Sequence, residues 1–112
     1  MKFSQLSKLM PEPVRHNDAI LKKMMLQPGD AKPIVQFSQA IFPPGEGVEV
    51  HSHESMHEVF FVQQGEVEFT VNGVSQMASE GACMLAEAGD SHALRNIGHE
   101  PLQLLFFGVE VS

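Results

Sequence analysis

The feature that most constrains this fold is a series of short apolar or alternating runs, separated by turn residues at fairly even spacing. Residues 66–77 show it most clearly, because apolar and polar side chains alternate up to the turn pair Asn72-Gly73. A period of two predicts a strand with one buried face, and Asn-Gly suits the two-residue turn of a β-hairpin. Helical periodicity is almost absent after the first ten residues. The chain is therefore predicted to be all-β, an antiparallel barrel or sandwich.

The predicted strands follow this punctuation along the chain. Residues 19–26 fit either a strand or a short helix, because periodicity does not separate the two. Residues 34–42 are predicted to form a strand that ends at the following Pro-Pro-Gly. The other predicted strands are 48–53, 57–63, 66–71, 74–77, 82–86, 92–96 and 102–109. Without a linker or a long repeat, we expect residues 1–112 to form a single domain, with residues 1–18 as an N-terminal arm.

Composition narrows the possible partners and locations. Apolar residues make up 43% of the chain and charged residues 19%, which is ordinary for a globular protein. The formal net charge of -7 argues against a nucleic-acid partner, which would require clustered Lys and Arg. No apolar stretch approaches the length needed to span a bilayer or to form a signal peptide. We therefore expect a cytoplasmic protein with no membrane partner.

Three residue types limit the chemistry. Cys83 is the only cysteine and lies in an apolar stretch, so we expect it to be a small buried side chain and not a nucleophile. The chain contains no Tyr and no Trp. Proton transfer in any reaction would therefore have to use a histidine, a carboxylate or metal-bound water.

Histidines supply the most specific signal. His51 and His53 are two apart in a predicted strand, so their imidazoles should project from the same face. Glu58 begins the next strand, and hairpin geometry can return its carboxylate to the two imidazoles. His92 would have to reach the same point from another strand of the barrel. Each histidine alone would more often be an ordinary hydrogen-bonded side chain, but the joint arrangement favours a site for a transition metal.

A first motif makes a family resemblance specific. Gly45, His51, His53, Glu58 and Gly65 have the spacing of the first motif of the cupin superfamily, and the chain resembles that superfamily. The resemblance implies a double-stranded β-helix (jelly-roll) barrel. The segment 51–73 is also loosely similar to short sugar-acid-processing cupins, which act on unsaturated uronates from pectin.

A second motif follows in the expected order. Gly81, Gly89, His92 and Asn96 match it, whereas Glu87 stands where the family has proline. The motif region is thus 45–96. The resemblance implies four metal ligands, listed as His51, His53, Glu58 and His92. Glu87 removes a residue that would rigidify a turn and leaves the ligand set untouched.

Several nearby residues receive lesser roles. His57 adjoins Glu58, so we expect it on the opposite face of the strand, as a surface or subunit-contact residue. Asn96 shares the strand parity of His92, which permits a pocket role, although the resemblance suggests mainly a structural one. Three further polar side chains could line the pocket if strand alternation holds: Gln36, Ser38 and Glu49.

These residues suit one divalent transition metal: Fe(II), Mn(II), Ni(II), Cu(II), Co(II) or Zn(II). Four protein ligands would leave two octahedral positions for water, dioxygen or a chelating substrate. Our first hypothesis is a metal-dependent enzyme that acts on a small polar chelating molecule, by dioxygenation, isomerisation or sugar-acid processing. Beyond the ligands, no catalytic residue is assigned.

Our second hypothesis is a non-catalytic module that binds or senses a small ligand or a metal. In either case a homodimer is expected, because small β-barrels leave edge strands that need covering. Its interface would use outward apolar positions near Val48, Val50, Val59 and Phe61.

Overall fold

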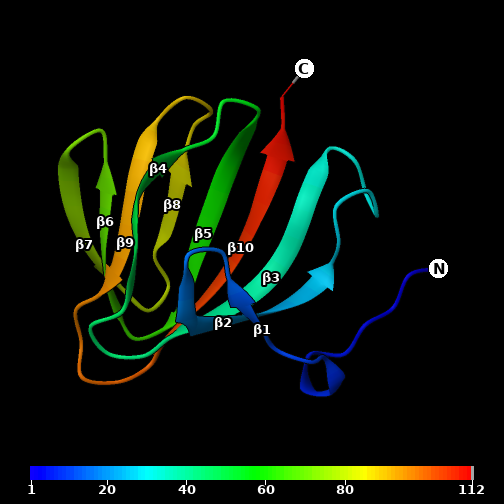
Figure 1. Cartoon of the computed structure of the whole chain (residues 1–112), viewed down its shortest axis with the longest axis horizontal. Helices are drawn as coiled ribbons and strands as arrows, with labels where there is room; N and C mark the ends of the chain where they lie inside the picture. The colour runs from blue at the N-terminus through cyan, green and yellow to red at the C-terminus, as the bar shows by residue number, and fades with distance from the viewer. Residues whose placement is uncertain (112) are drawn as a thin grey trace.

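The computed structural model describes residues 1–111 as two antiparallel sheets that face each other across one core (Figure 1). Within this described part, a single 3-10 turn, η1 (Leu6–Lys8), precedes the strands. The strands are β1 (Glu12–Val14), β2 (Asn17–Leu26), β3 (Ile34–Phe42), β4 (Gly47–Ser52), β5 (Met56–Gln64), β6 (Glu66–Val71), β7 (Val74–Ser79), β8 (Cys83–Ala86), β9 (Ser91–Asn96) and β10 (Leu102–Glu110). None of the described residues forms a helix long and apolar enough to cross a membrane.

The strand order gives the jelly-roll topology. One sheet has six strands in the order β1-β2-β3-β10-β5-β8, and the other has four in the order β4-β9-β6-β7. In Figure 1 the four-stranded sheet lies at the left, and β5, β10 and β3 lie to its right. Strands far apart in sequence are neighbours, as β3 and β10 are. The all-β jelly-roll prediction is confirmed.

The predicted strand boundaries agree with the structure to within two residues, apart from two elements. The ambiguous segment 19–26 lies in the ten-residue strand β2 and contains no helical turn. The short strand β1 lies inside the segment expected to be an arm, and its sequence Glu-Pro-Val is too short to show alternation. It pairs with β2 and extends the edge of the six-stranded sheet.

Alternation along the strands builds the core as expected. In β5, Phe60 and Val62 are buried on the same side as Glu58, and in β9 Leu94 is buried on the side of His92. The buried core cluster comprises Ile20, Ala40, Phe42, Phe60, Val62, Val67, Phe69, Leu94, Leu102 and Leu104. Because both sheets contribute to this cluster, apolar burial holds the two layers together.

A β-bulge in β4 interrupts the alternation near the histidines. Val48 pairs with Leu94 and His51 pairs with His92, so the register shifts by one residue between the two pairs. An extra residue in one strand resets which side chains point inward. Val48, predicted to face outward, therefore packs against the core together with the inward His51, whereas Val50 is 65% exposed.

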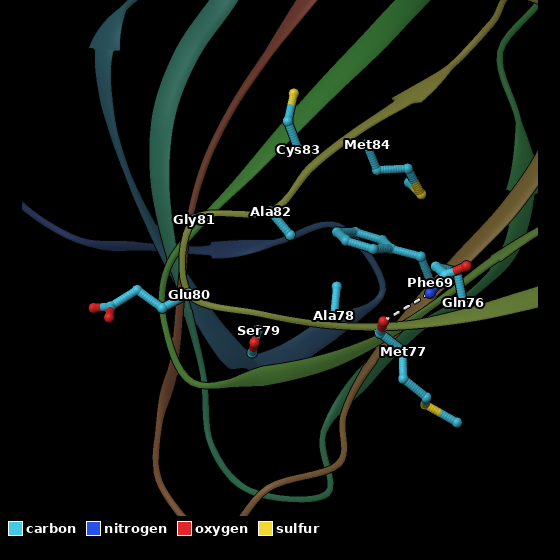
Figure 2. A pocket seen from close by; sticks show the side chains of 10 residues that line it. All are labelled: Phe69, Gln76, Met77, Ala78, Ser79, Glu80, Gly81, Ala82, Cys83 and Met84. Atoms are coloured by element: carbon cyan, nitrogen blue, oxygen red, sulfur yellow. Dashed lines mark hydrogen bonds between the residues drawn. The ribbon is translucent and has the colours of Figure 1, made fainter.

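The edge strands β7 and β8 place Cys83 differently from its prediction. Cys83 is exposed, and Figure 2 shows its sulfur pointing away from the ring of Phe69. A shallow depression of about 500 Å³ lies between these edges. Met84, the next residue, packs against the core because adjacent strand residues point to opposite faces. The apolar neighbours of Cys83 therefore did not imply its own burial.

The side chain of Asn96 connects the end of β3 to the loop between β9 and β10. Its Nδ2 donates to the backbone oxygens of Phe42 and Glu100, each at 2.9 Å. Its Oδ1 accepts the backbone N–H of Gly98 at 2.9 Å. The side chain is almost fully buried, so its bonds satisfy backbone groups that water reaches poorly. Asn96 is thus a structural residue.

Asn96→Ala should lower the free energy of unfolding by about 2–4 kcal/mol, because it leaves buried backbone groups without partners. Urea denaturation followed by circular dichroism measures this loss. Glu100→Ala is the matched control, since it removes an exposed side chain and keeps the backbone oxygen that Asn96 contacts. Equal stability of the two variants would contradict the structural role.

Candidate metal site

The four predicted ligands come together at one point inside the barrel. One side-chain ligand atom from each of His51, His53, Glu58 and His92 can be chosen so that all four lie within 4.8 Å of one another. This is the one such group of four found among residues 1–111. The residues come from β4, the segment just after it, β5 and β9, so strands of both sheets build the cluster.

Strand pairing positions the three imidazoles. His51 on β4 is directly opposite His92 on β9, and their ring centroids are 4.3 Å apart. The ring of His53 lies 5.0 Å from that of His51, nearly perpendicular to it. The backbone oxygen of His53 accepts the N–H of Gly89 at 2.9 Å. This bond fixes His53 although it lies beyond the end of the strand.

Glu58 supplies the single oxygen donor and lies deep in the site. The residue is 7% exposed. Its Oε1 atom lies 3.0 Å from Nε2 of His92 and 3.2 Å from Nε2 of His53. A buried carboxylate requires such partners, because removing its charge from water is costly. One carboxylate oxygen and two imidazole nitrogens therefore already point at a shared position.

His51 is held in the tautomer that a metal ligand needs. Its Nδ1 lies 2.9 Å from the backbone oxygen of Glu49, so Nδ1 carries the proton and Nε2 has a free lone pair. Burial lowers the pKa of His51 below the usual histidine range. The bond to Glu49 opposes this shift, whereas the nearby His92 and His53 add to it. The neutral, metal-binding form is favoured as a result.

His92 is the most buried of the three histidines, at 3% exposure. Its Nδ1 is buried and has no hydrogen-bond partner among the described residues. Burying a polar atom without a partner costs about 1–3 kcal/mol. Such a cost is typical of a functional site, where a side chain is placed for a ligand. Three imidazoles and one carboxylate within this radius fit a divalent transition metal.

The turn before His92 forms without the proline of the family motif. The Asp90 carboxylate accepts the backbone N–H of Glu87 and the amide of Asn72, each at 3.0 Å. These two bonds lower the pKa of the Asp90 carboxyl, the Asn72 amide contributing most. Hydrogen bonds thus replace the stiffness that proline would give. His57 anchors the same turn, because its Nδ1 accepts the N–H of Ala88 at 2.9 Å.

A cavity of about 640 Å³ opens onto the cluster and has polar as well as apolar walls. Gln36 lines it as the sequence predicted, and Glu49 is also among the lining residues, although its side chain is 90% exposed. Ser38 is fully buried and donates to Gln36 Oε1 at 2.7 Å. Lys22 and Arg15 also line this cavity and were not predicted from the sequence. Strand alternation counted from the buried Ile20 puts Lys22 on the inner face. The sequence alone did not show this, because residues 19–26 fit a short helix as well as a strand.

Comparisons with known proteins agree with this fold. The protein-family model described as "Cupin domain" matches residues 38–108. An oxalate-binding protein from Thermotoga maritima is 32% identical over 69 residues, which are 62% of this chain and 57% of that protein. A mannose-1-phosphate guanylyltransferase from Salmonella typhimurium is 32% identical over 76 residues, 68% of this chain and 16% of that protein. The match thus spans less than two thirds of either relative.

A solved structure has the same fold over nearly the whole chain. A crystal structure from Thermotoga maritima, described as a predicted oxalate decarboxylase, has a TM-score of 0.89 to this chain. The superposition covers 99% of this chain and 100% of that one, at 23% sequence identity. At this identity the likeness shows the fold.

His51 should titrate below the ordinary histidine pKa of about 6.5 in metal-free protein, because burial disfavours its charged form. The unfolded chain then binds more protons than the folded one, so this group makes the protein less stable as the pH falls below about 6.5. Histidine NMR spectra recorded with a chelator measure the pKa, and His51→Gln assigns the signal. A pKa above 6.5 would contradict the expected burial effect.

Proposed function

The chain belongs to the cupin family, and we propose that it is a metal-dependent enzyme acting on a small polar substrate that chelates the metal. The observation that carries the proposal is the convergence of the four ligand atoms within 4.8 Å. The ligand assignment to His51, His53, Glu58 and His92 is part of the proposal. The single-domain organisation and the cytoplasmic location stay predictions.

The residues divide the work of such a site. The four ligands would hold one divalent ion, with Glu58 supplying the negative charge and the imidazoles the nitrogen donors. A bound ion supplies Lewis acidity and lowers the pKa of water. Phe60 and Phe106 form apolar wall beside the cluster, and their stacked rings lie 6.0 Å apart. This wall excludes water from one side and strengthens polar contacts inside the cavity.

The substrate would be a small oxygen-rich molecule. The curated relative from Thermotoga maritima is called an oxalate-binding protein, and oxalate is a chelating dianion. The cavity volume of about 640 Å³ accommodates molecules of this size and larger ones. Dioxygenation, isomerisation and sugar-acid processing all suit a chelated substrate, and metal identity would separate oxygen chemistry from the other two.

The alternative function is a non-catalytic module that binds or senses a small ligand or a metal. The relative's name favours it, because that name describes binding and not turnover. A panel of sugar acids, polyols and oxygenase substrates, incubated with metal-loaded protein, distinguishes the two. Turnover of any member supports the enzyme, whereas ligand-induced stabilisation without turnover supports the binding module.

Protein purified without chelators should carry about one transition metal per chain. His53→Ala should lose most of this metal, because the ion would keep only three of its four protein ligands. Elemental analysis measures the metal content and identifies the ion. His99→Ala is the control, since His99 is exposed and outside the cluster. Full metal loading of His53→Ala would overturn the ligand assignment.

We also propose that the protein is a homodimer. The outer face of the six-stranded sheet carries apolar side chains on neighbouring strands, among them Leu21, Phe37, Ile41, Phe61, Leu85 and Phe107. Leu21, Ile41, Phe61 and Leu85 are each more than a third exposed. A contiguous apolar patch of this kind marks an interaction surface, and a second copy would cover it symmetrically.

Light scattering should give the mass of two chains for the wild type and of one chain for Phe61→Glu, because a charge in the middle of the patch opposes burial. Val74→Glu is the control, since Val74 is 73% exposed on β7, at the edge of the other sheet. A wild-type monomer, or a dimer unaffected by Phe61→Glu, would contradict this interface.

A further inference from the structure

Lys22 lies on β2 with its side chain on the inner face of the six-stranded sheet. It pairs across strands with Ala40, which is 2% exposed, and follows the fully buried Ile20 by two residues. Residues two apart on a strand share a face, so Lys22 points into the barrel. It lines the same cavity as His51 and Glu58. A cation thus lines the same cavity as the candidate metal site, on the six-stranded sheet that also carries Glu58.

The protein offers the charged ammonium of Lys22 few hydrogen-bond or ion-pair partners. Its Nζ lies 3.4 Å from Oε1 of Gln36, at the long limit of a hydrogen bond, and the same Oε1 accepts the shorter bond from Ser38. Lys22 takes part in none of the ion pairs found among the described residues. An inward lysine with three donors therefore keeps binding capacity for a ligand.

None of the carboxylates near Lys22 in the described part of the chain forms an ion pair with it. Glu12 is the cross-strand neighbour of Lys22 but is exposed and forms no ion pair with it. Glu49 lies within 3.5 Å of the Arg95 guanidinium. Glu58 is engaged by His53 and His92. None of these groups neutralises Lys22.

We propose that Lys22 binds a second carboxylate of the substrate, so that the substrate class is a small dicarboxylate longer than oxalate. This inference rests on the proposed metal site. A divalent ion, Glu58 and Lys22 would leave an excess of positive charge in the cavity that a dianion balances. The exposed Arg15 and Glu49, which also line the cavity, carry opposite charges and do not change this excess. One end of the ligand would chelate through a carboxylate and an adjacent hydroxyl, and the far carboxylate would pair with Lys22.

Pairing of Lys22 with a second carboxylate predicts different affinities for three simple acids, oxalate, lactate and malate. Oxalate would use both carboxylates in chelation and leave none for Lys22. Lactate and malate share one chelating end, a carboxylate with an adjacent hydroxyl, and differ by the second carboxylate of malate. Lys22 should therefore increase affinity for malate and leave the affinities for lactate and oxalate unchanged.

The test is calorimetric binding of malate, lactate and oxalate to Zn(II)-loaded protein, with metal content measured in parallel. We expect malate to bind about tenfold more tightly than lactate, the gain typical of a charged hydrogen bond. Lys22→Met should weaken malate binding about tenfold and leave lactate binding and zinc content unchanged. Lys22→Arg should restore part of the malate preference, and it keeps the test available if the methionine variant misfolds.

Lys23→Met is the matched control. Lys23 is the next residue on the same strand, and its Nζ donates to the backbone oxygen of Leu6 outside the barrel, at 3.3 Å. Its removal should leave malate binding unchanged. Equal binding of malate and lactate by the wild type, or equal loss of both in Lys22→Met, would overturn this inference while the metal site stands. A wild type that takes up no zinc would overturn the metal site and this inference together.

Discussion

The pairing of β4 with β9 is the interaction on which the site depends. It places His51 directly opposite His92, and the bulge in β4 lets Val48 and His51 face inward although they are three residues apart. Without the extra residue, strict alternation would turn one of them to solvent. Glu49 lies within the bulged segment, and its backbone oxygen accepts the hydrogen bond from Nδ1 of His51. One local irregularity thus supplies core packing, ligand direction and tautomer together.

Much of the fold and of the candidate cluster was predictable from the sequence. The period-two pattern identified nearly all the strands, because one face of each packs on a shared core. Parity and motif spacing identified His51, His53, Glu58 and His92 as side chains that meet. The orientation of residues near the β4 bulge was harder to predict. The bulge turns Val48 inward, and the sequence of β4 has no pattern that indicates it.

The positions of Cys83 and Lys22 also differ from what the sequence pattern predicts. Cys83 follows Ala82, which packs on the core, so apolar neighbours suggested burial, yet strand parity turns its own side chain outward. Lys22 was not predictable, because residues 19–26 fit either a strand or a helix and a charged side chain on an inner face departs from the usual hydrophobic pattern. Sequence patterns identify packing well, whereas residues placed for a ligand depart from those patterns and are recognised only in three dimensions.

Burial is distributed unevenly over the four candidate ligands. Glu58 and His92 are buried, whereas His51 and His53 are partly accessible. An ion held by all four would be shielded on the inner side and open to solvent on the other. Release would then begin at the two accessible imidazoles, while the inner pair retained the ion until last. The lifetime of the bound state would therefore depend on the order in which the ligands detach, and chelators would act from one direction.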